Sequence, residues 1–138
     1  MLPRHKNKTF ATLLAAVLGG LGAHRFYLRG VADKWGWLHL ASVPVTALII
    51  LFGVGQQIFF QAAALIISVL CGVLEALVLG LIPDERWDRQ FNAGTGKTSA
   101  SAWPLALLLV LTLGLGATAL IGAIARSFDL LFTGGAFG

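Results

Sequence analysis

One carboxylate stands inside an apolar stretch of this chain, and its chemistry needs an explanation. Glu75 lies in the apolar run 58–82, seven residues before its end. At 1.5 Å per residue it would lie roughly 10 Å inside a membrane. An ionised carboxylate there is costly unless it is paired, protonated or reached by water. Its candidate partner is Arg25 or His24. Two interpretations stay open: an ion, proton or ligand site, or a structural ion pair. We favour the ion pair, because one intramembrane carboxylate is thin evidence for transport.

The histidines do not form a catalytic group. His39 lies one turn inside the apolar run 35–54, where we expect it to form a hydrogen bond near the membrane interface. His5 and His24 are far from it in sequence, and no nucleophile lies beside any of the three. The single cysteine, Cys71, excludes an internal disulfide and a thiolate metal cluster. We therefore expect no enzymatic activity, no catalytic residue, no metal site and no cofactor.

Two patterns in the polar stretch 83–102 resemble ligand sites without meeting their requirements. Residues 94–98 read GTGKT, but a phosphate-binding loop needs a glycine where this chain has Phe91, and no strand precedes it. Residues 84–89 interleave acidic and basic side chains, which predicts a charged helix with local ion pairs and not a metal site. The basic residues are scattered over several loops, so we expect no binding to nucleic acid.

The elements that must hold these residues are membrane helices. Of the 138 residues, 57% are hydrophobic and 12% are charged, whereas about 25% are charged in a soluble domain. The mean hydropathy is +0.84. Residues 35–54, 58–82 and 103–125 each approach or exceed the about 20 residues that a span needs. The sequence predicts an all-α integral membrane bundle forming a single domain over 1–138, with a polar loop at 83–102 and an interfacial tail at 126–138.

The first apolar segment, residues 10–23, is short for a span. About 14 helical residues cover about 21 Å, against a hydrocarbon core of about 30 Å. The segment therefore either spans with support from its neighbours or re-enters. A re-entrant segment puts nine of the ten Lys and Arg residues on one side and a spanning one puts six there, so length and charge both favour re-entry. A cleavable signal peptide is disfavoured, because Leu21 stands where a small residue is required.

Tryptophans and basic residues gather on one side of the predicted bundle. The uncharged turn at Gln56-Gln57 makes a hairpin of the segments it joins, so loops 29–36 and 83–102 share a side. All four tryptophans fall on that side, and we expect them to form an aromatic anchor belt at the membrane interface. The positive-inside rule makes the same side cytoplasmic. The expected anchors are Trp35, Trp37, Trp87 and Trp103.

Small residues recur at every fourth position in three segments. This spacing places each set along one face of a helix, where small side chains let helices approach closely in lipid. Three such stripes predict a compact bundle, or a homo-oligomer that uses one of them. The stripes are Ala11, Ala15, Gly19 and Ala23; Ser68, Gly72, Ala76 and Gly80; and Gly114, Thr118 and Gly122.

The first segment ends in a distinctive string. Residues 8–15 read KTFATLLA, and residues 18–28 read LGGLGAHRFYL. This pattern resembles the start of the TM-two domain family, whose hallmark is a glycine-rich helix end that runs into Asp/His-Arg-Phe-Tyr-Leu-Gly. Here Arg29-Gly30 replaces the usual glycine followed by a basic residue. The family has two helices and its second typically carries an acidic residue, whereas Glu75 falls in the third segment. The extra helices look similar to those of a bacterial branch.

The residues of this motif have expected roles. Gly19, Gly20 and Gly22 would allow a sharp exit from the membrane, and Arg25 could then reach phosphate headgroups or Glu75. Phe26 and Tyr27 would anchor at the interface, while His24 stays beside the carboxylate as a second candidate partner. The motif residues are His24, Arg25, Phe26 and Tyr27.

The resemblance implies a multi-pass protein of the bacterial inner membrane with no cofactor and no defined reaction. The first functional hypothesis is a non-enzymatic interaction, scaffold or accessory subunit, with the lipid bilayer as its surroundings and a homo-oligomer or a larger membrane complex as its partner. The alternative is a small transporter or ion- or proton-conducting protein that uses Glu75 with Arg25 or His24. No residue supports the third option, an enzyme that acts on lipids.

Overall fold

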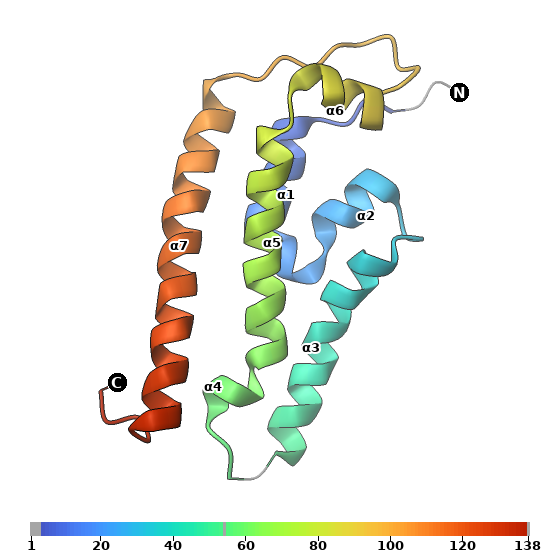
Figure 1. The fold of residues 1–138 in the computed structure, drawn as a ribbon. Helices are drawn as coiled ribbons and strands as arrows, with labels where there is room; N and C mark the ends of the chain where they lie inside the picture. Colours follow the sequence, from blue (N-terminus) through green and yellow to red (C-terminus); the bar gives the residue numbers. More distant parts are fainter. Residues whose placement is uncertain (1–3, 54, 138) are drawn as a thin grey trace.

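The computed structural model describes residues 4–53 and 55–137, and all the regular elements in them are helical (Figure 1). Three helices, α3, α5 and α7, are long and apolar enough to cross a membrane, and a shorter apolar helix precedes them. The prediction of an all-α membrane bundle is therefore confirmed. The elements are α1 (Lys8–Leu18), the 3-10 turn η1 (Gly19–Leu21), α2 (Ala23–Arg29), α3 (Lys34–Phe52), α4 (Ile58–Gln61), α5 (Ala63–Leu81), α6 (Asp84–Phe91) and α7 (Trp103–Phe132).

The first apolar segment folds back on itself. α1 begins beside α6 and runs along α5, and the chain then reverses through η1 into α2 (Figure 1). The two ends of this hairpin meet, because Lys6 Nζ, just before α1, donates a hydrogen bond of 2.6 Å to the carbonyl of Tyr27 near the end of α2. The eleven residues of α1 cover about 17 Å, roughly half of a membrane core. The segment thus folds back on itself instead of continuing as one straight helix, and its re-entry into a membrane stays a prediction.

α5 is the central helix, and two of the small-residue stripes meet on it. Its buried residues are Ser68, Gly72, Ala76 and Gly80, and the buried face of α1 and η1 includes Ala11, Ala15 and Gly19. At the closest approach, a Cβ atom added to Gly72 would lie 2.6 Å from Cα of Gly19. Backbone packs on backbone here, as the stripes predicted for a compact bundle.

The third stripe does not pack within the chain. Gly114, Thr118 and Gly122 are exposed on α7, and a Cβ atom added to either glycine would meet nothing within 4 Å. The packing role that we expected for these residues is wrong for the single chain. α7 instead approaches α5 through Gly116, next to Val73, on another face of the helix.

Several element boundaries differ from those predicted. The third segment is broken at Ala62 into α4 and α5, and α7 continues to Phe132, so much of the tail 126–138 is helical. The loop 83–102 begins with α6. The second segment ends at Phe52, and the predicted last residue, Val54, lies outside the described residues.

The tryptophans do not form one belt. Trp35 and Trp37 lie at the start of α3, which is placed partway along α5, whereas Trp87 and Trp103 lie on α6 and at the start of α7, beyond the end of α5 (Figure 1). Trp87 is 0% exposed and its Nε1 donates to the carbonyl of Lys6, so it cannot anchor in headgroups as expected. The N-terminal stretch lies against α6 at this residue. Trp103, at 75% exposed, and the half-exposed Trp35 and Trp37 are accessible, and their role as anchors stays a prediction.

Candidate functional site

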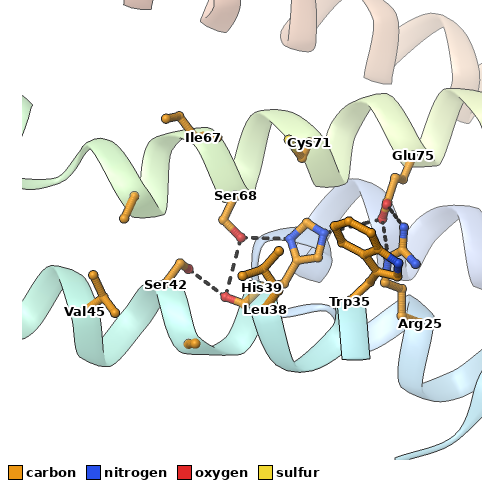
Figure 2. Close-up of a pocket in the computed structure, with 12 residues that line it drawn as sticks. Arg25, Trp35, Leu38, His39, Ser42, Val45, Ile67, Ser68, Cys71 and Glu75 are labelled. Atoms are coloured by element: carbon orange, nitrogen blue, oxygen red, sulfur yellow. Dashed lines mark hydrogen bonds and ion pairs between the residues drawn. The ribbon is translucent and has the colours of Figure 1, made fainter. Parts of the chain in front are cut away.

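Glu75 is the centre of a charged cluster between α2, α3 and α5. Arg25 donates to it with two nitrogens, Nε at 3.1 Å from Oε2 and Nη2 to Oε1 (Figure 2). His24 Nε2 also contacts Oε2. Sequence analysis named Arg25 or His24 as the partner, and the structure brings both to the carboxylate. Two nitrogens of one guanidinium on one carboxylate form the bidentate geometry, which fixes orientation as well as charge.

The cluster extends to α3 through His39. Its Nε2 lies 3.6 Å from Glu75 Oε2, and its Nδ1 lies 2.8 Å from Ser68 Oγ, whose hydroxyl donates to the carbonyl of Gly20 at 2.7 Å. His39 does form the expected hydrogen bond, but in the buried interior of the bundle. The sequence predicted only a packing role for Ser68. Its spacing of seven residues from Glu75 is about two helical turns, and this spacing indicates that both side chains lie on one face of the helix.

Sequence reasoning missed Asp33. This buried carboxylate caps α3 by accepting a hydrogen bond of 2.8 Å from the backbone N–H of Trp35. Its Oδ2 also lies 3.6 Å from Arg25 Nη1 and 3.9 Å from Arg29 Nε. The signal was available, because an aspartate directly before an apolar helix is a strong capping residue. Arg25 is therefore held between two carboxylates from two different elements.

The glycines position this cluster by letting the chain reverse sharply. Gly22 has φ of +72°, in the left-handed region, and a Cβ atom there would lie 2.6 Å from the carbonyl oxygen of Gly36. A side chain at Gly22 would meet both a backbone penalty and a clash. The reversal turns His24 and Arg25 toward Glu75. The glycines are therefore needed to form the charged cluster.

The aromatic residues of the motif also pack inside the chain. Phe26 stacks edge-on against Trp37 with ring centroids 5.5 Å apart and lies over Gly36. Tyr27 contacts Phe10 in the same way at 5.2 Å, and its hydroxyl accepts a hydrogen bond of 2.9 Å from the backbone of Asn7. We expected these side chains to be interface anchors, but their main contacts hold α2 against α1 and α3.

A second polar network ties the start of α1 to α6. The buried Lys8 donates to Asp84 Oδ1 at 2.9 Å and to Ser101 Oγ at 2.9 Å. The hydrogen bonds from Ser101 and Lys8 lower the pKa of Asp84 to about 2. Asp84 was expected to pair locally on its own helix, but its ion pair reaches across 76 residues instead. This network lies outside the candidate spanning helices and fastens the N-terminal helical hairpin at its open end.

Two cavities flank the Arg25–Glu75 pair. One, of about 530 Å³, lies between α3 and α5, and the other, of about 310 Å³, lies between α2, α5 and α6. Arg25 and Glu75 line both. Within residues 4–53 and 55–137, no group of three or more His, Cys, Asp or Glu side chains is arranged to hold a metal ion. The site offers charge and hydrogen bonds beside apolar space.

These observations define a small helical membrane protein with an N-terminal helical hairpin fastened to its central helix. In a family comparison, residues 4–57 match the model described as TM2 domain. The match covers 54 of the 138 residues and includes α1, α2 and α3, so this part of the chain is similar to the family that its sequence resembles. Comparisons with curated proteins and with solved structures found no match.

The matched residues do not form the charged cluster alone. Glu75, Ser68 and Gly72 lie on α5, outside the matched stretch. The central helix therefore supplies the carboxylate for Arg25, the hydroxyl for His39 and the backbone surface for Gly19. In this chain the stretch that matches the TM2 model is therefore packed against a helix that follows it.

Proposed function

We propose that this chain is a non-enzymatic small membrane protein that acts as an interaction or accessory subunit, in a homo-oligomer or a larger membrane complex. The single observation that carries this proposal is the uncovered stripe of Gly114, Thr118 and Gly122 on α7. The two stripes inside the chain show what such faces do here, since Gly19 and Gly72 bring two backbones together. The third offers the same surface to a helix of another chain.

The charged cluster supports this assignment because both of its carboxylates form ion pairs inside the chain. Glu75 is paired with Arg25 and His24, and Asp33 is paired with Arg25 and Arg29. A cluster whose carboxylates are paired in this way works as a structural lock for the hairpin. We further propose a location in the bacterial inner membrane, with loops 29–36 and 83–102 cytoplasmic, in line with their basic residues.

The test compares wild type with a variant that carries Gly114→Leu and Gly122→Leu. In lipid vesicles, site-specific cross-linking or counting of labelled subunits measures self-association, and co-purification from native membranes measures partner binding. We expect the double variant to lose the self-association or the partner binding that wild type shows. The matched control is Ala119→Leu, an exposed position on the same helix outside the stripe. If the double variant keeps its assembly size and its partners, the proposal is wrong.

A second function is favoured by one observation, the pair of cavities that meet at Arg25 and Glu75. A carboxylate with apolar space on both sides could act as the gate of an ion or proton path. Liposomes that contain the protein should then show a flux that Glu75→Gln abolishes. A flux that is the same in Glu75→Gln and in wild type, or no flux in either, removes this candidate and leaves the first intact.

A further inference from the structure

The larger cavity, between α3 and α5, has a polar end and an apolar end (Figure 2). Arg25, Glu75 and Trp35 lie at one end, and Val45 and Ala64 line the other. The volume of about 530 Å³ falls within the roughly 300–1,000 Å³ of small-molecule sites. A molecule that fills this space must therefore be an amphiphile with a charged or hydrogen-bonding head and an apolar tail.

The apolar part of the cavity faces the bilayer. It is bordered by Leu38, Val45 and Ile67, all of which are exposed on helices that can span a membrane. Ten residues of α3 separate Trp35 from Val45, which is about 15 Å of helix. A hydrocarbon chain from the surrounding lipid can enter this groove from the side and lie along it without leaving the apolar phase.

The charged residues at and beside the polar end sum to one excess positive charge. Arg25 and Glu75 line the cavity, Asp33 pairs with Arg25 and Arg29 next to it, and Lys34 precedes Trp35 at the start of α3, which gives three cations and two carboxylates. A guanidinium has five N–H donors. Two of the donors of Arg25 are directed to Glu75, and one nitrogen faces Asp33 at 3.6 Å, so N–H groups remain for another acceptor. Trp35 beside them supplies the amphipathic ring that suits a headgroup region.

We propose that this groove is a binding site for one anionic phospholipid, with its phosphate at Arg25 and Trp35 and one acyl chain along α3 and α5. The apolar cavity between α5 and α7 provides the internal comparison. It has a volume of about 360 Å³ and is lined only by apolar residues and Cys71, so it can hold a chain but cannot recognise a headgroup. Selectivity for an anionic headgroup is therefore expected at one groove and absent at the other.

The experiment is native mass spectrometry of the purified full chain in a mild detergent. The probes are phosphatidylglycerol and phosphatidylcholine with identical acyl chains, added in equal amounts. We expect one retained phosphatidylglycerol per chain, with a preference of about tenfold, because both lipids carry the phosphate but only phosphatidylcholine adds a choline cation, which the excess positive charge at this end of the cavity repels. Glycerol phosphate, which has the head without the chain, should not displace it, and competition by glycerol phosphate at equal concentration would overturn the proposal.

Three variants locate the site. Ala41→Phe fills the groove between α3 and α5 and should abolish the preference, whereas the matched Ala117→Phe in the other groove should leave it unchanged. Lys34→Gln, at an exposed position, removes one of the three cations and should reduce the preference two- to threefold without affecting the fold. Equal retention of the two lipids by wild type, or an unchanged preference in both Ala41→Phe and Lys34→Gln, would overturn the proposal. The α7 stripe plays no part here, so either proposal can fail alone.

Discussion

Two faces of this molecule carry the same pattern of small residues, but one is buried against another helix and the other is exposed. On one, α1 and η1 meet α5 so closely that Gly19 and Gly72 leave no space for a side chain between them. On the other, Gly114 and Gly122 of α7 stand open. Small residues at every fourth position thus allow close packing against another helix, but they do not determine which helix that is. The path of the chain decides that.

The path of the chain explains why the small-residue face of α1 and η1 packs against α5. α1 and η1 lie along α5, and the reversal at Gly22 then turns the chain into α2, so that Arg25 reaches Glu75 and the charged cluster holds the hairpin on α5. α7 arrives after a long connection and meets α5 through Gly116, so its stripe points away. The buried stripes should therefore determine the stability of the chain, and the exposed stripe should determine its association with other chains. Each prediction below tests this difference.

The largest effect is expected from Gly72→Leu. A Cβ atom at this position would lie 2.5 Å from the carbonyl carbon of Gly19, so backbone must move before any side chain is accommodated. Overpacking of a core costs about 1–3 kcal/mol, and more where backbone blocks relaxation, so we expect a loss of at least about 3 kcal/mol. The thermal unfolding midpoint in detergent micelles, followed by circular dichroism, measures it.

The control for this substitution is Gly122→Leu, the same change on the bare stripe. It should leave the unfolding midpoint unchanged, because nothing lies within 4 Å of the new Cβ atom. The division between the two faces would fail if Gly122→Leu destabilised the isolated chain as much as Gly72→Leu does.

The features of the fold and of the site that could be predicted from the sequence are those whose signals are local in the chain. The spans, the hairpin at Gln56-Gln57 and the link between Glu75 and the His24-Arg25 pair rest on hydropathy and on the cost of a lone charge in lipid, which act whatever the fold. The stripes on α1 and α5 were also visible, because their spacing is local. None of these needs the position of another helix to be known.

The rest depends on contacts between distant segments. Trp87 looked like an anchor, but it is covered by the N-terminal stretch at Lys6, 81 residues away. Asp84 was assigned to local pairs, yet its partner is Lys8. The contact of His39 with Glu75 and the open stripe on α7 likewise depend on how whole helices are placed. Pattern along a chain cannot supply these pairings.

Glu75→Gln asks whether charge, and not only close packing, holds the buried face together. The amide keeps the shape but leaves Arg25 and His24 without their carboxylate. Breaking a fully buried pair costs about 3–5 kcal/mol. Because the Glu75 side chain is 24% exposed and Arg25 retains Asp33, we expect about 2 kcal/mol, measured as above. A double variant with Arg25→Gln should lose less than the sum of the single changes, and strict additivity would show that the pair is not coupled.

Gly22→Ala tests the reversal that brings His24 and Arg25 to the carboxylate of Glu75. Alanine at φ +72° costs about 1–2 kcal/mol, and its Cβ atom would also press on the carbonyl oxygen of Gly36. We expect a loss of about 2 kcal/mol or slightly less and faster hydrogen exchange in α2. Gly96→Ala is the control, since Gly96 also has a positive φ, of +68°, but a Cβ atom there meets nothing within 4 Å. If the two variants were equally destabilised, backbone strain alone would explain the effect and the contact with Gly36 would be irrelevant.

The smallest effect is expected at the open end of the hairpin, where Asp84 holds Lys8. The pKa of Asp84 is lowered from 3.8 to about 2 in the folded chain by its hydrogen bonds with Ser101 and Lys8. The folded state therefore gains stability above pH 4 and loses that gain as the pH falls from about 4 to about 2. Asp84→Asn should lower stability at neutral pH by about 1 kcal/mol or less and should flatten the dependence on pH in this window. Hydrogen exchange at the start of α1 reports it, and an unchanged acid profile in Asp84→Asn would assign the loosening to another carboxylate.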